Sequence, residues 1–185
     1  MQVAEKNISG HQVFFVDDLL EKSEVSQFYA IVKKLSYVKA ERSHEGDEYL
    51  SFRVDFNTED LSSKLKVGQV SENLLSDLIP DKQYELYRAY INMTNYGDVE
   101  YPHTDCSVDQ KDITVLYYAH NQWEQDWGGE TLFYDDDSSA LAVAPTPGRF
   151  VVFPGAILHV GTVPSRICKV PRYSMALKYR LVEAA

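Results

Sequence analysis

The feature that most constrains the fold is a change in the sequence pattern at residue 84. From there on, short runs rich in β-branched and aromatic residues alternate with turn signals that contain Gly or Pro. The expected strands cover 84–93, 112–119, 130–134, 141–143, 149–153 and 172–181. Short strands at this spacing are typical of an antiparallel sandwich or barrel. We therefore expect a mainly β protein whose core lies within residues 84–181.

Residues 1–83 are expected to support this core. Apolar runs and helical spacing in this part predict several elements. They are strands over 12–16 and 49–56, helices over 23–35 and within 64–78, and a loop over 39–48. Two helices placed before a strand-rich segment would brace one face of its larger sheet.

Length and charge bound the class of protein. The chain has 185 residues and no linker rich in Pro, Gly or Ser, which predicts one domain. Its formal net charge of −10 disfavours a general nucleic-acid binder. Cys106 and Cys168 form no CxxC pair, which argues against a disulfide scaffold or a structural zinc site. With no signal-peptide pattern and no membrane-length apolar run, we expect a cytoplasmic protein.

The sharpest chemical signal is His103-Thr104-Asp105. On a strand, residues i and i+2 point to the same face, so this imidazole and carboxylate would project into one cavity. Of the five histidines, His159 has the best context for a third ligand, because it follows an apolar strand and a Pro-Gly turn. Two His and one carboxylate on one face form the facial triad that binds non-haem Fe(II). The competing interpretation is a chance motif with hydrogen-bonded core histidines. His120 is expected at the surface.

A candidate anion site follows His159 in the chain. On the strand expected over 172–181, Arg172 and Ser174 share a face opposite Tyr173 and Met175. A guanidinium beside a hydroxyl is suited to hold a carboxylate in a low-dielectric pocket. The competing interpretation is an Arg at a strand end on the surface. The position after a candidate metal ligand favours the pocket.

These motifs, taken in order, resemble the iron(II)/2-oxoglutarate-dependent dioxygenases, in particular their prolyl 4-hydroxylase-like branch. The matching elements are 90–97, 103–105, 114–118, 127–131, 147–153, His159 and 172–174. The resemblance covers a little over half of the chain, from about residue 84 to 181. It implies a double-stranded β-helix, which is a jelly-roll-like barrel, with N-terminal helices packed on its major sheet.

The resemblance also implies roles for individual residues. His103, Asp105 and His159 would bind Fe(II), and Arg172 would pair with the distal carboxylate of 2-oxoglutarate. The gap between His159 and Arg172 is longer than is common in the branch. Glycines 128 and 129 of the Trp127–Glu130 turn are expected to serve the backbone rather than the chemistry.

The resemblance also implies further pocket residues. Ser174 would assist Arg172, and Tyr118 resembles a tyrosine whose hydroxyl reaches the same carboxylate. Tyr96 is a candidate for the cosubstrate pocket or the substrate mouth. Arg88, Tyr90 and Asn92 alternate on one strand face and either line the cavity or form ordinary sheet surface.

The implied activity is that of a dioxygenase that uses Fe(II), 2-oxoglutarate and O2, with ascorbate as a candidate stimulant. It would hydroxylate an unactivated C–H bond and release succinate and CO2. Asp105 favours hydroxylation, since halogenating members carry a small residue there. The substrate would be a prolyl residue in a peptide or protein, a free amino acid or a small natural-product intermediate. The alternatives are a non-catalytic metal- or ligand-binding barrel and a nucleic-acid demethylase, which the net charge disfavours.

Substrate selectivity is expected in the loops around the barrel mouth. The candidates are residues 39–48, 106–111, 121–126 and 164–169. The oligomeric state is left open by the sequence.

Overall fold

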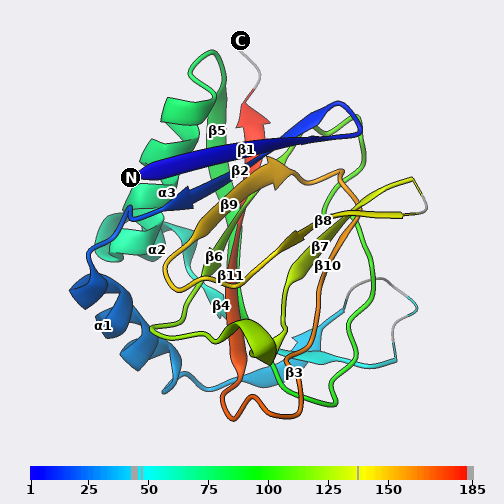
Figure 1. The fold of residues 1–185 in the computed structure, drawn as a ribbon. Helices are drawn as coiled ribbons and strands as arrows, with labels where there is room; N and C mark the ends of the chain where they lie inside the picture. The colour runs from blue at the N-terminus through cyan, green and yellow to red at the C-terminus, as the bar shows by residue number, and fades with distance from the viewer. Residues whose placement is uncertain (43–45, 47, 137, 183–185) are drawn as a thin grey trace.

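The computed structural model describes residues 1–42, 46, 48–136 and 138–182. Two antiparallel sheets form the core (Figure 1). The large sheet has the order β1-β2-β9-β6-β11-β5-β4-β3, and the small sheet has the order β10-β7-β8. The large sheet consists of β1 Gln2–Ile8, β2 His11–Asp17, β3 Val38–Glu41, β4 Ser51–Phe56, β5 Gln83–Thr94, β6 Ile113–Tyr118, β9 Phe150–Pro154 and β11 Arg172–Val182. The small sheet consists of β7 Thr131–Asp135, β8 Ser138–Val143 and β10 His159–Gly161.

Strand β11 sits in the middle of the large sheet and shows how the two faces differ. It pairs with β5 on one side and with β6 on the other. Met175 and Leu177 are fully buried in the larger hydrophobic cluster, whereas Arg172, Ser174 and Lys178 alternate with them on the opposite face. One face of the sheet is thus an apolar packing surface, and the other carries buried polar and charged groups.

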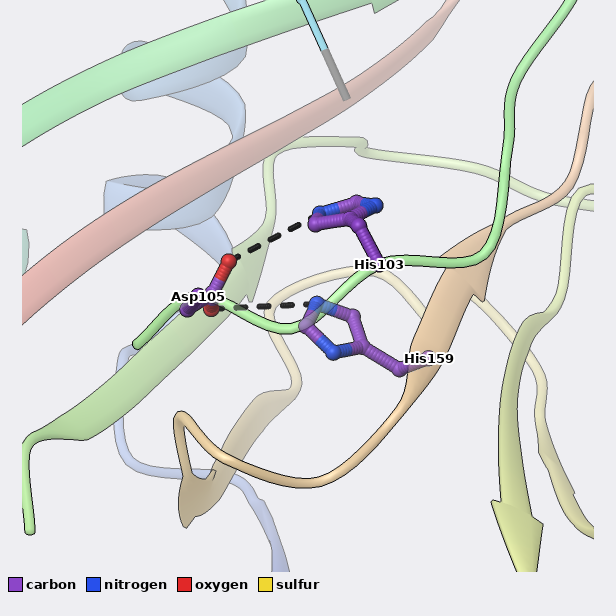
Figure 2. A group of neighbouring side chains, drawn as sticks. All are labelled: His103, Asp105 and His159. Carbon is purple, nitrogen blue, oxygen red and sulfur yellow. Dashed lines mark ion pairs between the residues drawn. The ribbon is translucent and has the colours of Figure 1, made fainter. Parts of the chain in front are cut away.

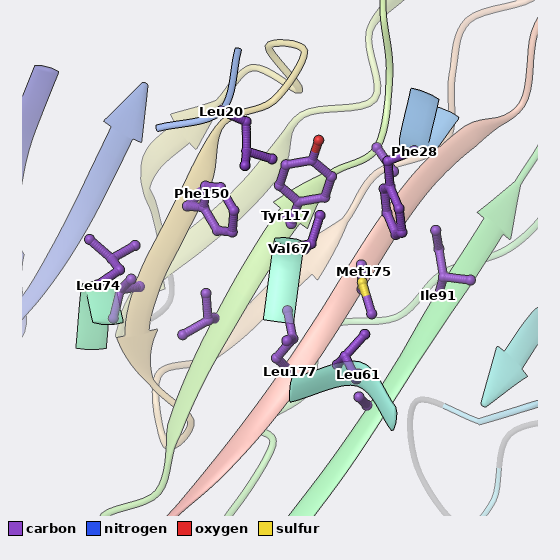
Figure 3. Packing of buried hydrophobic residues seen from close by; sticks show 14 of the residues in the cluster. Leu20, Phe28, Leu61, Val67, Leu74, Ile91, Tyr117, Phe150, Met175 and Leu177 are labelled. Atoms are coloured by element: carbon purple, nitrogen blue, oxygen red, sulfur yellow. The ribbon is translucent and has the colours of Figure 1, made fainter. Parts of the chain in front are cut away.

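Three helices cover the apolar face, on the side opposite the small sheet (Figure 1). They are α1 Lys22–Val32, α2 Thr58–Lys64 and α3 Lys66–Leu78. Helix α1 begins with a capping box in which Glu21 and Glu24 satisfy each other's main-chain N–H groups. Phe28, Leu61 and Leu74 reach from the helices into the same cluster as Ile91 and Leu177 (Figure 3). Burial of this apolar surface is the main force that fixes the sheet against the helices.

The mainly β fold predicted from the sequence is confirmed, with helices that brace one face. The expected strands and the helices over 23–35 and within 64–78 correspond to observed elements. Strands β1 and β10 and helix α2 were not expected, and β3 occupies the start of the expected loop 39–48, of which residues 43–45 and 47 lie outside the described chain. No helix among the described residues combines the length and the apolar character needed to cross a bilayer.

We expect Leu177→Ala to destabilise the protein by about 2–5 kcal/mol, because it opens a cavity where the central strand meets the helices. Ile31→Ala is the matched control, since Ile31 is 48% exposed on α1, and it should change the free energy of unfolding by less than about 0.5 kcal/mol. Urea denaturation followed by circular dichroism measures both. A loss below about 1 kcal/mol for Leu177→Ala would contradict this packing.

Candidate metal centre and cosubstrate pocket

The backbone brings His103 and His159 together. The main-chain N–H of each donates to the carbonyl oxygen of the other, at 2.9 and 3.0 Å. Asp105 N–H donates to the carbonyl oxygen of Gly155 at 2.7 Å, which anchors the same loop next to the turn before β10. The expectation that His103-Thr104-Asp105 lies on a strand is wrong. His103 forms an isolated bridge within the loop between β5 and β6.

The side chains of these three residues converge (Figure 2). Their ligand atoms all lie within 4.8 Å of one another. Asp105 Oδ1 lies 3.6 Å from His103 Nε2, and Asp105 Oδ2 lies 3.7 Å from His159 Nε2. The donor set of two imidazoles and one carboxylate suits a divalent transition metal with open coordination positions.

Hydrogen bonds fix which imidazole nitrogen faces the centre. The Nδ1 atoms of His103 and His159 lie 2.9 Å from the carbonyl oxygens of Tyr101 and Ile157. A carbonyl only accepts, so each Nδ1 carries the proton and each Nε2 presents a lone pair to the centre. Burial lowers the pKa of His159 to about 4, so its ring is neutral near pH 7, as a metal ligand must be.

Asp105 is held by two donors on one oxygen. Its Oδ2 accepts from Thr114 Oγ1 at 2.5 Å and contacts the ammonium of Lys178. Burial alone would raise the pKa of Asp105, but Lys178 and His159 lower it well below its ordinary value. The group is therefore a carboxylate, and its Oδ1 faces His103. The three residues fit a resident metal ion.

The guanidinium of Arg172 is buried beside this centre, with 2% of the residue exposed. Its Nε donates to the carbonyl oxygen of Gly129 at 2.6 Å, its Nη1 to Ser174 Oγ at 2.9 Å and its Nη2 to Thr131 Oγ1 at 2.9 Å. Tyr118 donates its hydroxyl to the same Thr131 Oγ1 at 2.7 Å, and its ring lies 5.4 Å from the guanidinium carbon. Tyr118 therefore helps to position Thr131, whose hydroxyl oxygen accepts a hydrogen bond from Arg172.

Two glycines make room for Arg172. A Cβ at Gly129 would lie 3.2 Å from Arg172 Cδ, and a Cβ at Gly161 would lie 3.0 Å from Nη1. Gly129 also has φ +79°, a region that favours glycine. The interpretation of Gly129 as a backbone requirement alone was therefore incomplete. Thr131, Gly129 and Gly161 were missed as anion-site residues, because only their side-by-side placement in the fold links them to Arg172.

One cavity joins the metal centre to Arg172. His103, Asp105 and His159 line it together with Arg172 and Ser174. Within the described part of the chain, no carboxylate lies at ion-pair distance from Arg172. Glu100 lines the same cavity, and the charge of Arg172 lowers its pKa, but the two groups form no ion pair. A buried cation without an ion-pair partner is costly, so the cavity fits a ligand that carries a carboxylate.

Asn92 and Glu100 are two further polar residues that line the same cavity. The Oδ1 atom of Asn92 is buried and has no hydrogen-bond partner in the structure, which leaves an acceptor for a bound ligand. Burial raises the pKa of Glu100, whose Oε1 accepts from Ser51 Oγ at 2.6 Å. Asn92 thus lines the cavity, one of the two alternatives left open by the sequence.

Tyr96 and His120 lie outside the cavity lining. Tyr96 is 63% exposed on the turn after β5, so of its two expected places the structure argues against the cosubstrate pocket, and the substrate mouth stays a prediction. His120 is fully buried, contrary to the expected surface position. Its Nε2 accepts from the main-chain N–H of Tyr173 at 3.1 Å, and its ring packs on Trp123. These contacts bury His120 just after the end of β6, and they join residues that are far apart in the sequence.

Comparison with known proteins finds one matching family model. Residues 91–180, which include the three candidate metal ligands and Arg172, match the model of the 2OG-Fe(II) oxygenase superfamily. The resemblance seen in the sequence is thereby confirmed for this segment. The match supports an oxidoreductase that uses Fe(II) and 2-oxoglutarate. No curated protein matches the chain.

Solved structures show the same fold at low identity. A Pseudomonas putida prolyl-4-hydroxylase has a TM-score of 0.68 and 14% identity, with 94% of each chain covered. A Trichoplax adhaerens prolyl hydroxylase in complex with a hypoxia inducible factor peptide has a TM-score of 0.67 and 16% identity, covering 91% of this chain and 83% of that chain. The epimerase SnoN from nogalamycin biosynthesis has a TM-score of 0.65 and 14% identity, covering 91% of this chain and 78% of that chain.

We expect the protein to bind one Mn(II) or Fe(II) ion under anaerobic conditions, as measured by isothermal titration calorimetry. His103→Ala removes one of three ligands and should weaken binding by more than about 100-fold, since loss of an outer-shell partner alone costs roughly 10–100-fold. His11→Ala is the matched control, because His11 is exposed at the start of β2, and this variant should bind the ion like the wild type. Equal affinity of the two variants would exclude this metal centre.

Proposed function

We propose that the protein is an Fe(II)- and 2-oxoglutarate-dependent dioxygenase that hydroxylates an unactivated C–H bond and releases succinate and CO2. The single observation that carries this proposal is the shared cavity. It holds a two-His, one-carboxylate cluster and a buried guanidinium that has no carboxylate within ion-pair distance among the described residues. The superfamily match over residues 91–180 supports the same chemistry.

The chemical nature of each side chain indicates its role in the proposed reaction. When bound, ferrous iron and 2-oxoglutarate supply the activation of O2 and the oxidation of the C–H bond. His103, Asp105 and His159 hold the metal, and Arg172 and Ser174 bind the distal carboxylate of 2-oxoglutarate. Thr131 and the carbonyl of Gly129 fix the plane of the guanidinium, which makes a bidentate contact available.

Apolar side chains form part of the remaining wall of the cavity. Phe153 and Leu116 line the cavity, and the Phe153 ring packs edge-on against the His159 ring with centroids 4.8 Å apart. Phe133 lies behind the same imidazole, at a centroid distance of 5.9 Å. An apolar wall lowers the local dielectric and so strengthens the electrostatic contacts of Arg172 and Asp105.

The substrate is proposed as a prolyl residue in a peptide or protein, a free amino acid or a small natural-product intermediate. The prolyl hydroxylases among the solved structures favour the first, but at 14–19% identity their likeness concerns the fold. The similar fold of an epimerase illustrates that a fold does not set the substrate.

A succinate-release assay tests the proposal. With Fe(II), 2-oxoglutarate, O2 and ascorbate, we expect a slow release of succinate without substrate and a faster release with one of three pools: peptides, free amino acids or nucleosides. Stimulation by the nucleosides alone would favour the demethylase. Absence of succinate release with every pool, while the metal still binds, would favour a non-catalytic barrel and contradict the proposal.

Arg172→Ala should raise KM for 2-oxoglutarate by about 30-fold or more, because truncating one partner of a buried charge pair costs roughly 2–5 kcal/mol. Arg149→Ala is the matched control: Arg149 pairs with Asp17 at 2.8 Å, and it is absent from the cavity lining. Its KM should stay at the wild-type value. An unchanged KM in Arg172→Ala would assign the anchoring role to another cation, of which Lys178 is the candidate because it lines the same cavity.

Gly161→Ala tests whether the position of the Arg172 guanidinium matters, while Arg172 itself is kept. The new Cβ would lie 3.0 Å from Arg172 Nη1, so the guanidinium must shift by a few tenths of an ångström. We expect KM for 2-oxoglutarate to rise by about 10-fold, because small misplacements of a binding group carry large costs. Mn(II) affinity should be retained, which separates this effect from damage to His159. A wild-type KM would show that Gly161 does not position Arg172.

A further inference from the structure

Glu100 is a carboxyl group of the cosubstrate cavity, which joins the metal centre to Arg172. It lies in the loop between β5 and β6 and lines this cavity. Its Oε1 accepts a hydrogen bond from Ser51 Oγ at 2.6 Å, which holds the side chain against the start of β4. Glu100 and Arg172 form no ion pair, yet the guanidinium is near enough to lower the pKa of Glu100. This carboxyl therefore lies near the cation that would hold the distal carboxylate of 2-oxoglutarate.

The charged neighbours of Glu100 keep their charge near neutral pH once a metal is bound. Arg172 on β11 and His103 in the same loop lower its pKa, and Asp98 raises it. An arginine stays protonated, and a histidine that binds a metal ion through Nε2 cannot take up a proton there. Strand β4 contributes the neutral hydroxyl of Ser51, and the neutral groups that β5 adds to the lining are Asn92 and Thr94.

The other charged side chains on these walls are already paired. The pairs are Lys178 with Asp105 in the cavity and Arg53 with Glu41 between β4 and β3. Burial raises the pKa of Tyr90 well above its ordinary value, so its hydroxyl stays neutral. With a metal bound, Glu100 is therefore the lining residue, among those that the structure describes, whose protonation responds to an added anion near neutral pH.

Binding of 2-oxoglutarate changes the charge around Glu100. Burial is the largest influence on this group and raises its pKa above the ordinary value. When the distal carboxylate of the cosubstrate pairs with Arg172, it matches the positive charge that favours the ionised form of Glu100. It also brings a like charge into the same cavity, and the other carboxylate offsets the charge of the metal ion. Each change favours a proton on Glu100.

A proton on Glu100 also improves the balance of hydrogen bonds. An ionised carboxyl only accepts, whereas a protonated one carries an O–H donor. The cavity already holds an acceptor without a partner, because Asn92 Oδ1 is buried and makes no hydrogen bond. The distal carboxylate of the cosubstrate adds further acceptors. A donor at Glu100 therefore meets a need that an ionised Glu100 would increase.

We propose that Glu100 is a further binding residue for 2-oxoglutarate: it takes up one proton as the cosubstrate binds, and the resulting O–H donates to the distal carboxylate. This inference rests on the proposed function, which supplies the identity of the dianion. The proton passes from solvent to a carboxylate oxygen of Glu100, and no other covalent bond forms or breaks. Because binding takes up a proton, the affinity for 2-oxoglutarate falls as the pH rises, by up to about 10-fold per pH unit.

Calorimetry that counts protons tests the proposal. The protein is loaded with Mn(II) under nitrogen, which prevents His103 and His159 from titrating. 2-Oxoglutarate is then titrated from about pH 6 to about pH 8.5, at each pH in two buffers of different ionisation enthalpy. We expect the uptake of about 0.3 to 1 proton per bound 2-oxoglutarate within this range, and an affinity that is about 10-fold weaker at the upper end.

Glu100→Gln separates the proton from the rest of the side chain. The amide is neutral at every pH, keeps an oxygen for Ser51 Oγ and carries an N–H donor. We expect no proton uptake, an affinity that does not change with pH, and binding about 5-fold or more tighter than the wild type near pH 8.5. Glu85→Gln is the matched control, because Glu85 is exposed on β5, and it should behave like the wild type.

Ser51→Ala moves the pH range of the effect. It removes the hydrogen bond that lowers the pKa of Glu100, so the ionised form becomes less stable. We expect proton uptake in this variant to extend to higher pH than in the wild type, as measured by the same titrations. An unchanged range would show that Glu100 is not the group that takes up the proton.

Three further results would overturn the inference. They are no proton uptake by the wild type, the same uptake in Glu100→Gln as in the wild type, and weaker binding by Glu100→Gln at every pH, which a merely structural role predicts. Failure of the proposed function would look different. In that case neither the wild type nor Glu100→Gln would bind Mn(II) and 2-oxoglutarate at any pH, or both would bind them and release no succinate under aerobic conditions.

Discussion

The pair of main-chain hydrogen bonds between His103 and His159 joins the loop after β5 to strand β10. The candidate metal centre depends on this bridge, because it brings two side chains together that are far apart in the sequence. The carbonyl oxygens of Tyr101 and Ile157 then orient the two rings, so that the lone pairs converge. Thr114 and Lys178 fix the carboxylate between them. Local backbone geometry therefore prepares the ligand set before any ion is bound.

Strand β11 separates the polar cavity from the hydrophobic cluster, because its alternate residues face opposite sides of the sheet. Its even-numbered residues from Arg172 to Lys178 line the cavity, while its odd-numbered ones pack on the helices. The two cations stand at different ends of the same row, Arg172 by Ser174 and Lys178 by Asp105. The hydrophobic cluster on the far face is what makes it possible to bury these charges, since it fixes the strand in the centre of the sheet.

Much of this arrangement could be predicted from the sequence because it follows from period-two alternation and ordered motifs. The alternation placed Arg172 and Ser174 on one face, as observed. The contacts that hold Arg172 could not be predicted in the same way. Thr131 and Gly161 belong to different strands of the small sheet, and their contact with β11 depends on how the two sheets face each other. The buried position of His120 likewise depends on packing by Trp123 and Tyr173.

The central claim is that one cavity holds both a metal ion and the anion bound by Arg172. Calorimetric titration of 2-oxoglutarate into the protein, with and without Mn(II) under nitrogen, tests it most directly. The account predicts that each ligand tightens the other by the same factor, because linkage between two sites is reciprocal. Affinities for 2-oxoglutarate that are identical with and without Mn(II) would contradict a shared cavity.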